Sequence, residues 1–194
     1  MRNILSAMGR VYLRFFARQA RPIMIYHRKN FQGKKCKDIR ISSSTVLGHK
    51  SNLLLHKNVY IGHYCRIDAS NGVEIDEGVQ FGSFVSIISH SSHRSIRLYG
   101  DEYTNYKDPI GYIKGPVYIG KYSFIGPHSV IAPNTKIGKG SLIKAYSYVR
   151  GDFPDFSIIA GNPAKVVGDT RESDAKILEQ HPEIKPFYDA WAKN

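Results

Sequence analysis

An aliphatic residue recurs at every sixth position through the C-terminal half of the chain. The series runs Ile119, Ile125, Ile131, Ile137, Ile143 and Val149, and a small hydroxyl residue stands four positions after each of the first five members. A period of six matches neither the helical turn nor the alternation of a half-buried strand. It predicts a short strand followed by a corner, so that three units close a triangular coil of 18 residues and successive coils stack as parallel strands.

A weaker copy of the repeat lies upstream. It includes Ile61, Ile67, Ile75, Phe81 and Ile87, with a two-residue slip around Val73. The two copies predict an all-β solenoid over residues 41–168 that is interrupted by an irregular loop at 91–116. The segment 169–194 has the apolar spacing of a helix and is expected to pack against the solenoid.

The positive charge of the chain is concentrated at its N-terminus. The formal net charge is +12, and residues 1–40 contain eleven basic residues and one acid. Because the remainder is nearly neutral and no nucleic-acid-binding motif is present, we do not expect a nucleic-acid partner. Apolar residues between Ile4 and Phe16 have helical spacing among arginines, which predicts a basic helical extension over 1–40. Peripheral contact with an anionic membrane and packing on the solenoid or a neighbouring subunit both stay open.

The composition indicates the cellular compartment in which the protein is expected. No apolar run approaches the ~20 residues that cross a bilayer, and two cysteines, Cys36 and Cys65, fit a reducing compartment. We therefore expect a cytoplasmic protein, or one held peripherally at the inner face of the membrane.

The segment Ile159-Ala160-Gly161-Asn162-Pro163-Ala164-Lys165-Val166-Val167 follows the repeat. Repeat and segment together resemble the hexapeptide-repeat acyltransferases, in particular the galactoside, maltose and bacterial polysaccharide O-acetyltransferases, over about residues 45–168. The resemblance implies a left-handed parallel β-helix, a homotrimer, and acetyl-CoA as co-substrate for O-acetylation of a carbohydrate hydroxyl. The left hand comes from the resemblance alone.

Two histidines, His90 and His93, stand where the repeat gives way to the loop. Transfer of an acyl group from a thioester to a hydroxyl needs a base near neutral pH, and imidazole titrates in that range. Solvated loop histidines are the ordinary interpretation, but relatives in the resembled family carry their catalytic histidine just before such a loop. His90 is therefore the expected general base of a direct transfer, with His93 in support or as the second choice; a cysteine nucleophile is the weaker alternative.

Further site residues follow from the same resemblance. Among the expected cofactor-binding residues, Ala145 would pack on the pantetheine arm, Arg150 would lie where relatives have a small hydroxyl residue, and Lys165 would lie near the nucleotide phosphates. Pro127 has no N–H to offer an oxyanion, so Gly126 or another group must serve. In the loop, Tyr99, Tyr103 and Tyr106 are the expected sugar-binding side chains, although a subunit-contact loop is nearly as well supported.

Three other interpretations remain open from the sequence. A zinc enzyme on this fold would need three converging ligands, and the spacing of His90 and His93 does not match that class, so no metal is expected. N-acetylation of an amino sugar is disfavoured because residues 1–40 are too few for a separate nucleotide-binding domain. A noncatalytic trimeric scaffold would need only the repeat.

Overall fold

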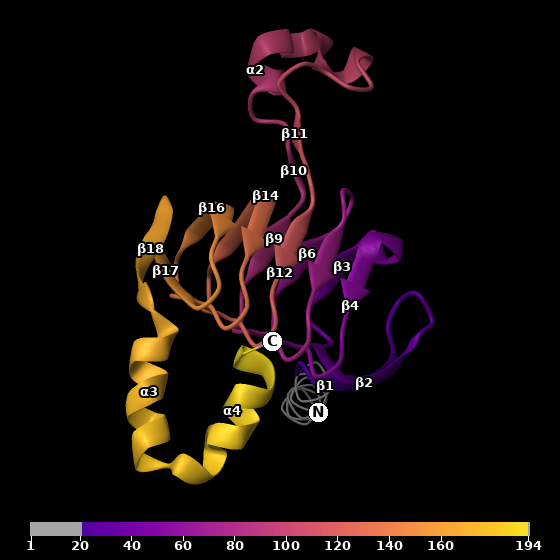
Figure 1. Ribbon diagram of the computed structural model, residues 1–194. Helices are drawn as coiled ribbons and strands as arrows, with labels where there is room; N and C mark the ends of the chain where they lie inside the picture. Colours follow the sequence, from indigo (N-terminus) through magenta and orange to yellow (C-terminus); the bar gives the residue numbers. More distant parts are fainter. Residues whose placement is uncertain (1–20, 194) are drawn as a thin grey trace, which may run out of the picture.

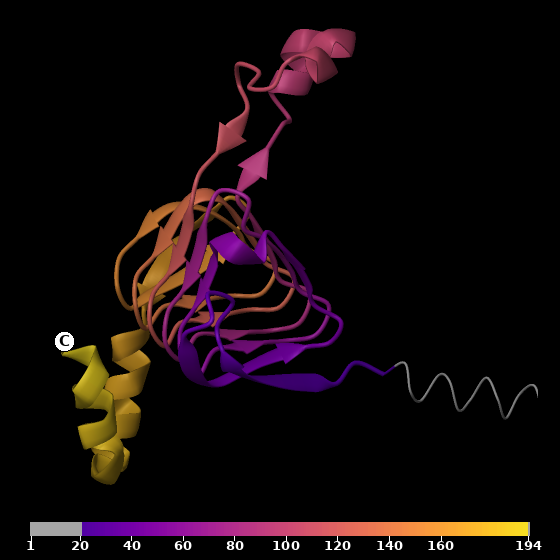
Figure 2. The same ribbon diagram turned by 90° about the vertical axis from the view of Figure 1, so that its right-hand side faces the viewer.

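The computed structural model describes residues 21–193, and its main body is a parallel β-helix of triangular coils (Figures 1 and 2). The first face is formed by β2 (Lys35–Ser42), β5 (Tyr60–Ile61), β8 (Gln80–Phe81), β13 (Phe124–Ile125), β15 (Leu142–Ile143) and β17 (Ser157–Gly161). The second is formed by β3 (Val46–Gly48), β6 (Arg66–Asp68), β9 (Ser86–Ile88) and the first parts of β14 (Val130–Ile137) and β16 (Tyr148–Phe153). The third contains β4 (Leu53–Leu55), β7 (Val73–Ile75), β12 (Val117–Ile119) and the later parts of β14 and β16.

The coils have three different lengths, and the last, in which Leu142 pairs with Ile158, has 16 residues. Downstream of the loop, Phe124 pairs with Leu142, which gives the expected 18-residue coil. Upstream, Arg66 pairs with Ser86 and Val46 with Arg66, so each coil has 20 residues. The extra residues fall at the corner between the second and third faces, where the short 3-10 helix η1 (Lys50–Asn52) and the turn at Ser70–Gly72 lie. The slip in the repeat thus marks an enlarged corner.

The aliphatic repeat positions form the core. Ile119, Ile125, Ile131, Ile137 and Ile143 are fully buried inside the prism. The hydroxyl positions are also buried: Ser123 Oγ donates to the carbonyl of Gly138 at 3.1 Å and Ser129 Oγ to that of Lys144 at 3.1 Å. The repeat therefore encodes both the apolar filling and the satisfaction of the corner carbonyls.

The N-terminal part departs from the expected helical extension. Residues 1–20, which carry the proposed basic helix, lie outside the described residues. Residues 24–42 form an antiparallel hairpin of β1 (Met24–Lys29) and β2, and β2 is already the first strand of the prism. The solenoid thus begins before residue 41, because Ile39 and Ile41 point into its core.

The loop at 91–116 projects from the enlarged corner as an arm (Figures 1 and 2). Its stem is the two-stranded ladder of β10 (His90–Ser91) and β11 (Ile113–Lys114), and its tip carries α2 (Ser95–Tyr99) and the 3-10 helix η2 (Gly100–Asn105). His90 is the first residue of the stem.

The C-terminal part closes the prism. β17 turns back through a cis Asn162–Pro163 bond into the antiparallel β18 (Ala164–Asp169). Then follow α3 (Thr170–Gln180), η3 (Pro182–Ile184) and α4 (Lys185–Ala192), whose Trp191 packs on Tyr122 with ring centroids 4.8 Å apart. No helix among residues 21–193 is long and apolar enough to cross a membrane.

Candidate active site

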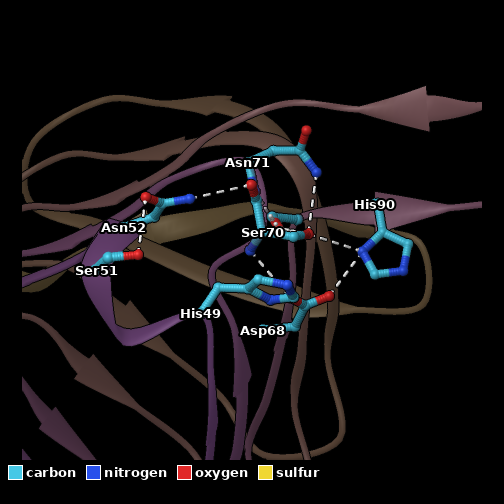
Figure 3. A network of polar contacts seen from close by, with 8 residues as sticks. His49, Ser51, Asn52, Asp68, Ser70, Asn71 and His90 are labelled. Carbon is cyan, nitrogen blue, oxygen red and sulfur yellow. Dashed lines mark hydrogen bonds and ion pairs between the residues drawn. The ribbon is translucent and has the colours of Figure 1, made fainter.

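His90 lies against two residues of the preceding coil. Its Nδ1 is 2.6 Å from Oδ2 of Asp68 and 3.0 Å from Oγ of Ser70 (Figure 3). β6 and β9 pair with a 20-residue offset, so extending that register by two residues places Ser70 beside His90. The length of the upstream coil therefore creates the contact.

The contact with Asp68 fixes how the imidazole is protonated. An ionised carboxylate only accepts hydrogen bonds, so Nδ1 carries the proton and donates it to Asp68. Within the described residues Nε2 has no hydrogen-bond partner, and the His90 side chain is 39% exposed. In the neutral imidazole with its proton on Nδ1, an accessible Nε2 is the nitrogen that can accept a proton, which is the arrangement of a general base.

Asp68 is held ionised by its surroundings. Its side chain is only 10% exposed, and this burial alone would raise the pKa of the carboxyl group. The backbone N–H of Ser70, which donates to Oδ1 at 2.9 Å, and the positive form of His90 outweigh burial, so the pKa of Asp68 is lowered from its usual value. Asp68 is therefore a carboxylate at neutral pH.

The lowered pKa of Asp68 predicts a pH-dependent contribution to stability. A carboxyl group whose folded pKa is depressed stabilises the fold at pH above its unfolded pKa, ~3.9. That contribution is lost as the pH falls through the lower folded pKa. We expect Asp68→Asn to reduce the free energy of unfolding at pH 7, with the difference from wild type shrinking below about pH 4. Urea titrations from pH 7 to 3 measure this; a difference that grows toward acid would contradict it.

Further polar groups hold Asp68 and Ser70 in place. His49, at the start of η1 with φ of 54°, brings Nδ1 to 3.2 Å from Oδ1 of Asp68. Asn71 Nδ2 donates to Ser70 Oγ at 3.1 Å, and Ser70 Oγ is 3.0 Å from the buried Ser89 Oγ. Figure 3 shows these side chains converging from successive coils on the Asp68 carboxylate and the Ser70 hydroxyl.

The stem of the arm covers one side of the site. The ring of Tyr112 stacks on His90, with centroids 5.8 Å apart and an 11° interplanar angle. Burial, with smaller effects of Tyr103 and Asp68, raises the pKa of Tyr112, so its hydroxyl stays protonated at neutral pH. Tyr112 is thus the tyrosine of the arm that contacts the imidazole.

The other candidate residues of the arm are placed differently. His93 is exposed and bonds through Nδ1 to Ser91 Oγ at 2.7 Å, outside the Asp68 network. Tyr99 and Tyr106 pack on each other at 4.6 Å, and the Tyr99 hydroxyl accepts the N–H of Ile110 at 3.0 Å. These contacts hold Tyr99 and Tyr106 together at the arm tip, where Tyr106 is 52% exposed.

The expected cofactor residues lie on the downstream coils. Ala145, Arg150 and Lys165 are exposed. Gly126 is buried, and its N–H donates to the carbonyl of Ile143 at 2.8 Å. That N–H is used in coil stacking, so the sequence-based suggestion that it serves an oxyanion does not fit this geometry.

The close approach of the backbone at Gly126 predicts that a larger residue at this position destabilises the fold. A Cβ at Gly126 would meet Ala145 N at 2.5 Å and Ile143 O at 2.6 Å, both backbone atoms. We expect Gly126→Ala to cost about 1–3 kcal/mol in denaturant unfolding. Gly48→Ala is the matched control, because its Cβ would meet nothing nearer than 3.7 Å. Equal losses in the two variants would contradict the packing role.

Sequence reasoning missed Asp68, Ser70, His49 and Tyr112 as site residues. An acid stands at 68 where neighbouring repeats have glycine, as at Gly62 and Gly82, and this departure was the available signal. A uniform 18-residue coil would have placed Ser70 beside Ile88 rather than His90. When the two-residue slip is applied to every upstream coil, Ser70 comes to lie beside His90.

Two alternative mechanisms, metal catalysis and a cysteine nucleophile, are weakly supported by residues 21–193. No group of three or more His, Cys, Asp or Glu side chains within residues 21–193 is placed to hold a metal ion. Burial raises the pKa of both thiols, Cys36 and Cys65, which disfavours the nucleophilic thiolate.

Comparison with known proteins places this geometry in context. Residues 112–151 match the family described as bacterial transferase hexapeptide (six repeats). Serine acetyltransferase 4 of Arabidopsis thaliana is 29% identical over 84% of this chain and 42% of its own length. A probable acetyltransferase of Mycobacterium tuberculosis is 30% identical over 73% of this chain and 45% of its own length. The chain thus spans less than half of these curated relatives.

Solved structures share the fold. A galactoside acetyltransferase in complex with coenzyme A superposes with a TM-score of 0.58 at 23% identity, over 72% of this chain and 66% of that one. A maltose O-acetyltransferase from Clostridium difficile gives 0.54 at 22% identity, over 66% and 64%. A mutant of AntD, an N-acyltransferase from Bacillus cereus in complex with dTDP and coenzyme A, gives 0.58 at 19% identity, over 75% and 88%. Residues 112–151 thus match the bacterial transferase hexapeptide family, and the chain shares its fold with these solved acyltransferases.

Proposed function

We propose that the protein is an acetyl-CoA-dependent O-acetyltransferase that acts on a hydroxyl of a bacterial polysaccharide or oligosaccharide. The observation that carries the proposal is the pairing of His90 Nδ1 with the Asp68 carboxylate at 2.6 Å, which leaves Nε2 accessible. Relatives and structural neighbours named acetyltransferases support the acyl donor. Neighbours named for galactoside and maltose support a sugar acceptor.

In the proposed reaction the thioester of acetyl-CoA supplies the acyl group. Nε2 of His90 takes the proton of the acceptor hydroxyl as its oxygen forms the new ester bond. Asp68 stabilises the imidazolium that results, because a buried carboxylate 2.6 Å from Nδ1 interacts strongly with the positive charge. The proton then passes from Nε2 to the departing thiolate, so His90 returns to its starting form.

The arm supports a sugar acceptor. Tyr112 stacks on the imidazole and Tyr103 lies in η2 of the same arm, and aromatic faces with polar tips suit a carbohydrate ring and its hydroxyls. Tyr99 and Tyr106, which pack on each other, would form the outer part of this surface, and the exposed His93 would assist in acceptor binding.

The downstream coils fit coenzyme A. Ala145 offers a small exposed corner, and Lys165 and Arg150 provide exposed cations for phosphate groups. Gly126 allows the backbones below this surface to approach closely. We include in the proposal a left-handed β-helix and a homotrimer, in which this surface of one subunit faces His90 of the next.

A panel of acceptors tests the proposal. The purified full chain is incubated with acetyl-CoA and glycans, with an amino sugar and free serine as alternative acceptors, and the release of free thiol is followed. We expect thiol release to depend on a hydroxyl-bearing glycan and ester acetate to appear on it. Amide product on the amino sugar alone would overturn O-acetylation, and no turnover with any acceptor despite bound coenzyme A would favour a scaffold.

A further inference from the structure

The hairpin of β1 and β2 places like charges opposite each other. Lys29 and Lys35 are register partners across the two strands, and both are exposed, as is the adjacent Lys34. Like charges directly opposite in a ladder are destabilising. No ion pair within the described residues involves Lys29, Lys34 or Lys35. The arrangement is therefore unfavourable for the isolated chain and favourable beside an anionic partner.

The surroundings of these lysines are also positive. Residues 21–40 contain seven basic residues and one acid, Asp38. A hollow of about 650 Å³ beside the hairpin is lined by Arg28, Lys29, Lys35, Cys36, Lys37 and Asp38. A hollow with four cations and one carboxylate suits a phosphate-bearing group.

Apolar side chains are interleaved with the charges on β1. Ile23 is 63% exposed, Ile25 42% and Tyr26 71%, and the exposed Arg21 and Arg28 flank them. β1 is also the edge strand of its sheet. Exposed aliphatic and tyrosine side chains among cations are typical of surfaces that insert into the headgroup region of a bilayer. A soluble polyanion would make no favourable contact with these exposed apolar side chains.

The charge is distributed unevenly along the prism. The hairpin lies at the end opposite β18 and α3 (Figure 1), and residues 169–194 contain six acids and four basic residues. An anionic surface would attract the hairpin end and repel the C-terminal end. Residues 1–20, by sequence, add four arginines and no acid next to the hairpin.

We infer that the β1–β2 hairpin is a docking surface for an anionic lipid bilayer, with Lys29, Lys34 and Lys35 at the headgroup phosphates and Ile23 and Tyr26 at the interface. This surface holds the prism with its N-terminal end toward the membrane. The arm projects from a lateral corner (Figure 2), and its stem begins at His90, so both stay accessible. The inference is independent of the proposed transferase reaction.

Vesicle sedimentation of the full chain tests the inference. We expect binding to phosphatidylcholine vesicles that contain phosphatidylglycerol, little binding to phosphatidylcholine alone, and weaker binding as salt rises. The triple variant K29Q/K34Q/K35Q should lose about 100-fold in partitioning, which corresponds to ~1 kcal/mol for each cation near the surface. Its melting temperature should not fall, because the substitutions remove a repulsion. The control K136Q/K176Q/K185Q changes the net charge equally at exposed positions elsewhere and should bind like wild type.

The variant I23S/Y26S separates lipid from other polyanions. A bilayer surface predicts that this variant loses vesicle binding while its affinity for double-stranded DNA, a soluble polyanion, is unchanged. The inference is overturned if the lysine triple variant binds vesicles like wild type, if its control loses as much, or if I23S/Y26S binds vesicles normally. Thiol release with a soluble acceptor should be unchanged in all these variants, so failure here is distinguishable from failure of the proposed reaction.

Discussion

Replacement of His90 by alanine is expected to lower kcat/KM for acetyl transfer by about 10²–10⁴-fold, the range that general-base catalysis contributes. The variant loses the imidazole whose Nδ1 lies 2.6 Å from the Asp68 carboxylate and whose Nε2 faces solvent. Because the exposed cations Arg150 and Lys165 are untouched, its dissociation constant for coenzyme A should stay near that of wild type. Steady-state thiol release and isothermal titration measure the two quantities.

Two matched variants show whether the effect belongs to His90 alone. His56, which follows β4, is also paired with a carboxylate: its Nε2 lies 2.9 Å from Oε1 of Glu74 on β7 of the third face. His93 lies three residues after His90 in the arm. His56→Ala should retain normal turnover, and His93→Ala should mainly raise the KM of the acceptor. If His93→Ala lost as much kcat as His90→Ala, the assignment of the base would be wrong.

The Asp68→Asn variant is expected to lower kcat by about 100-fold, within the ~10²–10⁴-fold total of general-base catalysis. The neutral amide removes the charge that stabilises the imidazolium, and its NH₂ group can donate to Nδ1 and favour the wrong tautomer. The acceptor and coenzyme A do not need Asp68 for binding, so KM values should change little. Measuring kcat and KM separately tests this split.

Asp76 provides the control for Asp68. It also follows a buried repeat isoleucine, Ile75, and its Oδ2 accepts from the Tyr118 hydroxyl at 3.2 Å. Asp76→Asn should therefore affect packing of the third face but leave kcat near wild type. Equal losses of kcat in the Asp68 and Asp76 variants would mean that the effect is structural rather than catalytic.

The repeat predicted the fold well because an aliphatic residue at each repeat position is buried in the prism. The aliphatic repeat residues from Ile119 to Val149 fill the prism, and the hydroxyl residues donate hydrogen bonds to corner carbonyls. The residues that define the local sequence pattern are therefore the ones that make the tertiary contacts. The hairpin of residues 24–42 was not anticipated, since its alternating pattern is obscured by charges and its role as the first strand depends on pairing with Tyr60 and Ile61.

The site was predictable only in part. His90 was identifiable because it ends the repeat and begins the arm. Its partners depend on which residues stack across coils, and that requires the coil length, which differs between the two halves of the prism. Asp68 and Ser70 are 22 and 20 residues away in sequence, and only the 20-residue register brings them to the imidazole. Tyr112 meets His90 because the arm returns along its own stem.

Chemical rescue of His90→Gly by added imidazole tests whether His90 is the base that activates the acceptor. We expect the variant to have little turnover and imidazole to restore thiol release in a saturable way, because the base is returned to the space beside Asp68. Rescue should be much weaker in the double variant with Asp68→Asn. If His90→Gly binds coenzyme A normally yet retains wild-type turnover, or if imidazole restores nothing, then His90 is not the base that activates the acceptor.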